Sequence, residues 1–174
     1  ANTTGTENTA VGMSSSIANT TGNYNASFGK GTLQTNTTGS QNTAIGTNAL
    51  QNATTANSNT SVGYYALQAN TTGTENTAVG QVTLATNTTG NYNSGFGRAV
   101  LNENSTGSNN TGVGWKALES NTTASNNTGI GYFALNTNTT GDQNVAIGRN
   151  TLDANTTGSY NVATGSQALS ANTT

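Results

Sequence analysis

The side chains that could act as acids, bases or nucleophiles are few in this chain and lie far apart along it. The sequence contains no His and no Cys, which removes imidazole catalysis, thiol chemistry, disulfides and nearly all zinc or copper sites. No nucleophile elbow or phosphate-binding loop is present. The carboxylates have no basic partner at a recurring spacing; they are Glu7, Glu75, Glu103, Glu119, Asp142 and Asp153. We therefore expect a protein that is not an enzyme, with no catalytic residue, no metal site and no cofactor.

Aromatic side chains are the better candidates for binding. Tyr64, Trp115 and Tyr132 fall at the same phase of a 17-residue spacing, so in a regular repeat they would share one edge. Exposed rings along a rod can pack against the faces of sugar rings, which makes these three residues candidates for glycan stacking. The structural alternative is that the rings only cap an apolar edge or fill a groove between subunits.

Asn-Thr-Thr triplets form a second candidate set, because each is a formal acceptor for N-glycosylation. The candidate attachment residues are Asn2, Asn19, Asn36, Asn70, Asn87, Asn121, Asn138 and Asn155, and Asn172 begins one more triplet. In a cell that glycosylates such sites, sugars would recur once per repeat and cover the protein. The interpretation that we favour is structural: a turn whose Thr residues form a ladder.

All these residues belong to one 17-residue tandem repeat. Counting Asn2 as repeat position 1 gives ten consecutive copies over residues 2–171, with no insertion and partial repeats at both ends. Thr at position 3, Asn at position 7 and Gly at position 11 occur in every copy. Residues 1–174 thus form a single repeat array, and the interrupted ends predict a fragment of a longer protein.

The repeat predicts an all-β fold, a parallel β-solenoid or β-roll of ten 17-residue coils. Positions 7–11 read as one short strand, and positions 13–15 as a weaker extended stretch. Stacked copies of position 7 can form an amide ladder that satisfies buried polar groups. This structural ladder would contain Asn8, Asn25, Asn42, Asn59, Asn76, Asn93, Asn110, Asn127, Asn144 and Asn161. Disorder is the competing interpretation, but the constant spacing and the reserved apolar positions oppose it.

The alternation of side chains along the strand leaves an apolar residue without an obvious partner. Small residues such as Ala78 and Gly80 suit the inside of a narrow coil, so residues such as Val79 would point outward in a continuous stripe. A stripe of that kind needs covering. We therefore expect a homotrimer or a filament; the alternative is a monomer with its Val and Leu residues together inside the coil.

Composition limits the partners. Hydrophobic residues make up 30% of the chain and charged residues 6%, and the net charge is -2. This charge gives no electrostatic reason to bind nucleic acid. No apolar run approaches the roughly 18–20 residues that span a bilayer, so we expect no membrane insertion. The expected partners are further copies of the same chain and, through the aromatic residues, cell-surface glycans.

Two families resemble the repeat. The segment Asn144-Val145-Ala146-Ile147-Gly148 resembles the head-domain signature of trimeric autotransporter adhesins, and Asn42-Thr43-Ala44-Ile45-Gly46 is a weaker match. The whole unit, with its link Ala-Leu-x-x-Asn-Thr-Thr-Gly, looks still more like repeat regions of phage-type tail-fibre proteins. The resemblance implies a trimeric, extracellular structural protein: a shaft or spacer on a cell surface or in a virion fibre. The alternative function is a ligand-binding solenoid that recognises ice or carbohydrate.

Overall fold

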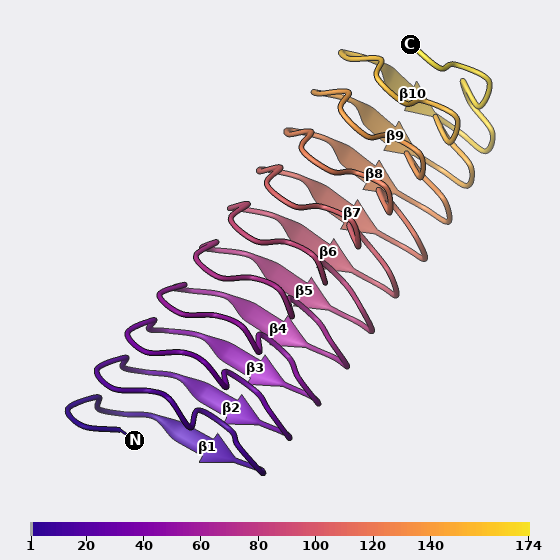
Figure 1. The fold of residues 1–174 in the computed structure, drawn as a ribbon. Coiled ribbons are helices and arrows are strands. Elements are labelled where there is room, and N and C mark those ends of the chain that lie inside the picture. Colours follow the sequence, from indigo (N-terminus) through magenta and orange to yellow (C-terminus); the bar gives the residue numbers. More distant parts are fainter. Residues whose placement is uncertain (1) are drawn as a thin grey trace.

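The computed structural model describes residues 2–174, which form a parallel β-solenoid with one short strand in each coil (Figure 1). We number the coils from 1 to 10, beginning at residue 2. The ten strands are β1 (Thr9–Val11), β2 (Ala26–Phe28), β3 (Thr43–Ile45), β4 (Thr60–Val62), β5 (Thr77–Val79), β6 (Ser94–Phe96), β7 (Thr111–Val113), β8 (Thr128–Ile130), β9 (Val145–Ile147) and β10 (Val162–Thr164). No helix occurs within residues 2–174. The expected all-β solenoid is confirmed.

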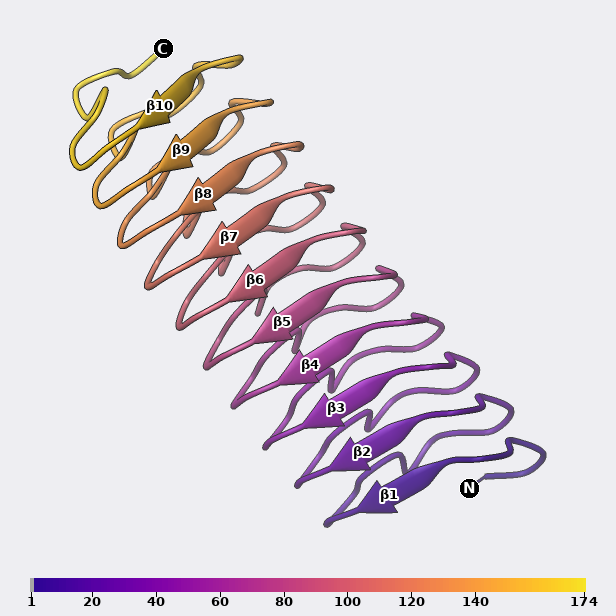
Figure 2. The same ribbon diagram turned by 180° about the vertical axis from the view of Figure 1, so that it is seen from behind.

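The strands pair in parallel and in chain order, so every coil lies directly on the one before it. The register never slips: Thr77 of β5 pairs with Thr60 of β4 on one side and with Ser94 of β6 on the other, each at the same repeat position one coil away. Figures 1 and 2 show the ten arrows side by side and the two termini at opposite ends of the rod. At about 4.8 Å per strand, ten coils extend for roughly 48 Å.

The interior of the rod is a column of Leu side chains lined by small residues. Repeat position 15 is a fully buried Leu in eight consecutive coils; these residues are Leu33, Leu50, Leu67, Leu84, Leu101, Leu118, Leu135 and Leu152. The central residue of each strand faces this column and is small, as Ala44, Ala78 and Gly112 illustrate. Successive side chains of a strand point to opposite faces, so the flanking strand residues face outward.

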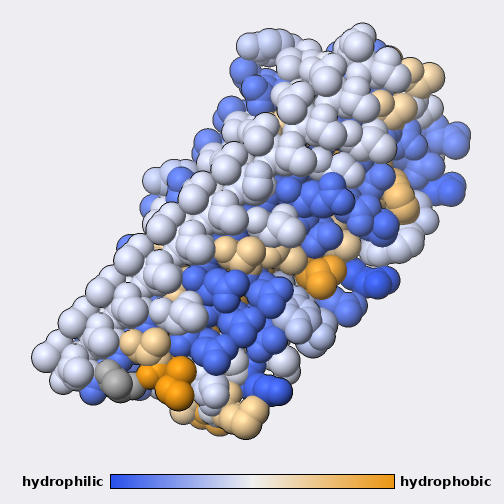
Figure 3. Space-filling model, viewed as in Figure 1, coloured by the Kyte–Doolittle hydropathy of each residue, from blue (hydrophilic) through white to orange (hydrophobic). Residues whose placement is uncertain are grey.

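The outward strand residues include the predicted apolar stripe. We use this name for the residues at repeat position 10 in coils 1 to 9: Val11, Phe28, Ile45, Val62, Val79, Phe96, Val113, Ile130 and Ile147. Each is exposed or half-buried. The Leu residues therefore lie inside and the Val, Ile and Phe residues outside, and the two sets do not share one interior. Figure 3 shows a rod face on which apolar side chains are isolated among hydrophilic ones.

The expectation of a second extended stretch at positions 13–15 is wrong. This segment is a run of turns, in which positions 13 and 15 both have a positive φ, as at Tyr65 (57°), Leu67 (50°), Val82 (51°) and Leu84 (52°). A left-handed conformation costs a residue other than Gly roughly 1–2 kcal/mol. The coil accepts this cost because these turns direct Leu into the interior and return the chain to the next strand.

The invariant Gly at position 11 has two reasons to be Gly. At Gly80 φ is 134°, a region that other residues rarely adopt. A Cβ atom at Gly80 would also collide with the carbonyl of Gly97 in the next coil. Because the coils are stacked at the spacing of a β-ladder, this clash would recur along the rod.

Side-chain sizes inside the rod are matched between coils. Position 14 holds Ala, Thr or Ser in most coils but Val100 in coil 6. A Cβ atom on Gly112, in the strand of the next coil, would collide with Val100 Cγ1. A Cβ atom on Gly95 would lie 3.4 Å from the same methyl group and 2.6 Å from Thr83 Cγ2. Thr83 and Val100 are thus each accommodated by a Gly in the strand of the next coil.

Candidate functional site

The ten asparagines at position 7 form a column that links each coil to both of its neighbours. In coil 3, the backbone N–H of Asn42 donates to Oδ1 of Asn25 (3.0 Å), and Asn42 Nδ2 donates forward to the carbonyl of Ala56 (2.8 Å). The backbone link to the preceding Oδ1 recurs without a gap from Asn25 to Asn161. The column satisfies buried backbone groups that no strand partner reaches, so its role is structural.

The asparagines at position 1 form a second ladder. Asn87 Nδ2 donates to Oδ1 of Asn70 in the preceding coil (2.8 Å) and to the carbonyl of Gly90 in its own coil (3.0 Å). The ladder is interrupted once, in coil 4, where Ala53 takes the place of Asn. The Oδ1 atom of Asn36 in coil 3 is therefore buried without a hydrogen-bond partner.

This second ladder contains the candidate glycosylation residues. Asn19, Asn36, Asn70, Asn87, Asn121, Asn138 and Asn155 are at most 3% exposed, and each Nδ2 donates to a carbonyl in its own coil. A glycan bonded to Nδ2 is incompatible with this geometry, because the atom is both buried and engaged. Asn2, in the first coil, is exposed. Asn104 starts the variant triplet Asn-Ser-Thr and belongs to the same ladder.

The two threonines that follow each of these asparagines differ in their environment. At position 2 the hydroxyl donates to a carbonyl of the next coil, as Thr71 does to Thr88 (3.1 Å) and Thr88 to Ser105 (2.9 Å). At position 3 the side chain is exposed in every coil, as at Thr72 and Thr89. The first column of hydroxyl groups strengthens the stacking, and the second faces the solvent.

Two of the three predicted stacking residues come together. The rings of Trp115 in coil 7 and Tyr132 in coil 8 have centroids 5.0 Å apart, and both side chains are exposed. Phe133 joins them, 5.2 Å from Trp115 and 4.6 Å from Tyr132. Two cations flank the rings, since Lys116 Nζ lies 5.6 Å from the Trp115 centroid and the Arg149 guanidinium 5.8 Å from that of Tyr132. We call these five residues the aromatic cluster.

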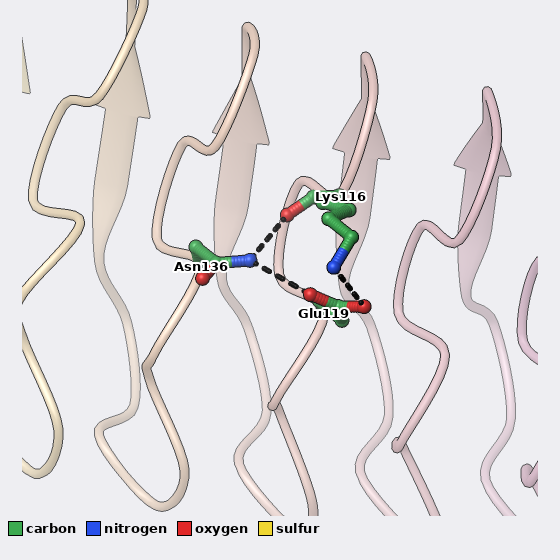
Figure 4. A network of polar contacts seen from close by, with 3 residues as sticks. All are labelled: Lys116, Glu119 and Asn136. Carbon is green, nitrogen blue, oxygen red and sulfur yellow. Dashed lines mark hydrogen bonds and ion pairs between the residues drawn. The ribbon is translucent and has the colours of Figure 1, made fainter.

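A polar network adjoins the aromatic cluster (Figure 4). Lys116 Nζ forms an ion pair with Glu119 Oε1 at 3.0 Å. In the next coil, Asn136 Nδ2 donates to Glu119 Oε2 (3.2 Å) and to the carbonyl of Lys116 (3.0 Å). Within residues 2–174 this is the only ion pair between side chains. The network holds Lys116 and Glu119 in place beside the rings.

Coil 9 has no complete counterpart of this polar network. Asp153 occupies the repeat position of Glu119, and Asn150 that of Lys116. The Oδ1 atoms of both residues are buried and receive no hydrogen bond. Coil 9 therefore has acceptor atoms to which the protein supplies no donor.

Tyr64 lies apart from the aromatic cluster, three coils before Trp115. Its ring contacts only that of Tyr65 among the aromatic pairs within residues 2–174, with centroids 4.1 Å apart and planes at 75°. Hydrogen bonding to Tyr64, and secondly to Asn48, lowers the pKa of Tyr65, whereas hydrogen bonding to Tyr65 raises the pKa of Tyr64. The prediction of a single edge shared by all three residues is geometrically correct, but only two of them form one surface.

The described part of the chain offers no other site. Residues 2–174 contain no pocket and no group of three or more carboxylates that could hold a metal ion. None of these residues belongs to a helix long and apolar enough to cross a membrane. The six carboxylates singled out in the sequence are distributed over five coils.

Comparisons with protein-family profiles, with curated proteins and with solved structures gave no match. The function of the chain therefore has to be argued from its own geometry.

Sequence reasoning missed the charged and polar residues that surround the rings of the aromatic cluster. Lys116, Glu119, Asn136 and Arg149 occupy variable repeat positions, which the repeat pattern does not single out. A signal was present: coils 7 to 9 contain four of the ten charged residues at positions 12, 13 and 16, beside the single Trp of the chain.

Proposed function

We propose that this chain is a structural repeat segment, a shaft or spacer, of an extracellular fibre or adhesin. The observation that carries the proposal is the uninterrupted 17-residue register of a rod that has no pocket within residues 2–174. Each coil is bonded to the next by strand pairing, by two asparagine ladders and by a column of hydroxyl groups. Such a structure transmits force and sets distance, and it needs no catalytic residue for either task.

Self-association is part of this proposal. The apolar stripe presents one Val, Ile or Phe per coil along nine coils, and in coil 1 Val11 is 55% exposed. A partner that covers the stripe along its whole length must itself repeat at the spacing of the coils. A further copy of the same chain meets this requirement, because its stripe has the same period. We propose a homotrimer or a filament in which the stripes pack together.

The resemblance of the repeat to adhesin heads and tail-fibre regions agrees with this role, and it is the reason for proposing a cell surface or a virion fibre as the location.

A ligand-binding solenoid is the second candidate. The observation that favours it is the aromatic cluster, which is confined to coils 7 to 9 and is not required by the repeat.

Light scattering coupled to size-exclusion chromatography tests the assembly. One chain has a mass of 17.5 kDa, so a trimer would give about three times that value. A Val79→Asp, Val113→Asp variant should dissociate the assembly, since it places charges in the stripe. A wild-type mass of one chain would contradict self-association.

The spacer role is tested in the complete fibre by removing residues 53–120, which form four whole coils. The register continues across the junction, and the fibre should shorten by about 19 Å when imaged by electron microscopy. An unchanged length, or loss of the fibre despite normal production of the protein, would contradict the role of spacer.

A further inference from the structure

We propose that the aromatic cluster is a binding platform for a neutral polysaccharide, recognised through the faces of its pyranose rings. This inference extends the proposed role of the rod by giving it a site of attachment, but the site is formed within one chain and does not require assembly. It rests on three observations: the mutual contact of the rings, whose planes are tilted by 46° to 89°, their exposure, and the balance of charge around them.

The rings form a surface that the fold does not need. Interior packing is complete without them, since Leu118 and Leu135 in the same coils are fully buried. Trp115 and Tyr132 are 36% and 43% exposed, although aromatic side chains are costly to leave in water. Other coils hold Thr47, Gln81 or Ser166 at the same repeat position. The rod therefore forms equally well with small polar residues at this edge.

The size of the platform suits a short stretch of a sugar chain. The residues lie at equivalent positions of three successive coils, so the platform extends along the rod for about 10 Å. That length accommodates about two pyranose rings. Sugar rings present C–H groups on their flat faces and hydroxyl groups at their edges, which matches aromatic faces bordered by polar side chains.

The polar border supplies both donors and acceptors for hydroxyl groups. Arg149 is exposed and makes no ion pair within residues 2–174, so its N–H groups remain available beside Tyr132. Glu119 is an acceptor held in place by Lys116 and Asn136.

Charge selects the class of ligand. Lys116 and Arg149 are balanced by Glu119 and Asp153, so the platform has no net charge, and the chain as a whole carries -2. An anionic glycan would gain nothing from such a surface. Flat, equatorially linked chains of neutral sugars, which expose ring faces along their length, are the ligands that this surface fits.

The chain contains one Trp, so its fluorescence reports on this platform alone. We would titrate the intact protein with cellohexaose and chitohexaose, and with a galacturonate hexamer as the anionic comparison. We expect the two neutral oligosaccharides to change the Trp115 emission and the anionic one to leave it unchanged. No response to either neutral hexamer at millimolar concentration would overturn the proposal, and so would a stronger response to the galacturonate.

Two variants assign the response to the pair of rings formed by Trp115 and Tyr132. Tyr132→Ala keeps the Trp reporter and should weaken binding about tenfold, because it removes one ring of the pair. Tyr64→Ala is the matched control: it removes an exposed ring at the same repeat position, where the neighbouring coils carry no aromatic residue at positions 12 and 13, and affinity should not change. Equal losses in the two variants would overturn the assignment.

Arg149→Ala provides an independent check that does not alter any ring, and we expect it to weaken binding severalfold. An unchanged affinity would exclude the polar border from recognition. Far-UV circular dichroism and solution mass should be the same for all variants. If binding fails while mass and rod length are as proposed, the platform is disproved and the spacer role stands.

Discussion

Repeat position 16 carries different residues, with different contacts, in coils 2 to 4 and in coils 7 to 9. In the first region position 16 is Gln in each coil, and the side chains form a ladder: Gln51 Nε2 donates to Gln34 Oε1 (2.8 Å), and Gln68 Nε2 to Gln51 Oε1 (3.0 Å). In the second region the residues are Glu119, Asn136 and Asp153, and Glu119 is paired with Lys116 of the aromatic cluster.

The difference separates what the repeat requires from what it permits. A ladder of identical amides propagates because each side chain offers the next both a donor and an acceptor. The mixed set of coils 7 to 9 forms no such ladder: Asn136 donates to Glu119, and the Oδ1 atom of Asp153 has no partner. Loss of regularity at an edge, while the interior keeps its pattern, is what we expect where a surface serves binding.

The largest expected effect tests the feature that the two regions share. Asn42→Ala in coil 3 and Asn110→Ala in coil 7 each remove a buried side-chain amide: its Nδ2 donates to the coils on both sides, and its Oδ1 accepts from the backbone N–H of the next Asn. Each should lower the free energy of unfolding by about 3 kcal/mol or more, since several buried groups lose their partners. Denaturant unfolding followed by circular dichroism measures this change. A much smaller loss in one region would show that the ladders differ in strength.

A second change exploits the size matching of coils 6 and 7. Gly112→Ala should cost about 1–3 kcal/mol, because the new methyl group collides with Val100. Adding Val100→Ala, which restores the pair found at Ala66 of coil 4 and Ala78 of coil 5, should recover most of the loss. Thermal unfolding of the two single variants and the double variant provides a double-mutant cycle, which measures the coupling free energy between residues 100 and 112. Additive losses would exclude the contact between the two side chains.

A gain in stability is expected in coil 4, at the end of the regular region. Ala53→Asn should raise the free energy of unfolding by about 1–2 kcal/mol, because it gives a donor to the unpaired Oδ1 atom of Asn36. Coil 8 provides the precedent, since Asn121 there combines with the same small residue at position 4, Ala124. Urea unfolding measures the gain, and a loss of stability would contradict this account of the ladder.

The smallest effect concerns the ion pair. Glu119→Gln makes position 16 of coil 7 resemble the Gln ladder of coils 2 to 4, and it removes the attraction to Lys116. This pair is partly exposed, so stability should fall by at most about 1 kcal/mol, and less at high salt. Unfolding midpoints at low and high salt measure the difference. A large loss that persists in salt would mean that the network supports the fold.

Much of the rod could be predicted because its interior obeys a strict pattern. The Asn at position 7 and the Gly at position 11 never vary, and stacking explains both residues: Asn42 bonds to its neighbouring coils, and Gly80 has no room for a side chain. The outward direction of Val79 followed from the alternation of a strand.

The turns and the binding surface could not be predicted in the same way. Leu67 and Val82 adopt a positive φ that local preference disfavours, because packing of the complete coil overrides it. The group formed by Trp115, Phe133 and Arg149 arises where the variable positions 12 and 13 of three successive coils meet. No rule of the repeat specifies those residues, and their contacts become visible only when the coils are stacked.

The constant register also makes this protein a ruler. Tyr24, Tyr92 and Tyr160 are exposed at the same turn, and each is four coils from the next. With about 4.8 Å per coil, they stand as marks at intervals of about 19 Å along the rod. Gain or loss of a four-coil block would change the number of marks and the total length together, while the interval between marks stayed fixed. The length of the rod would then change in whole multiples of about 19 Å, while the structure of each coil stayed the same.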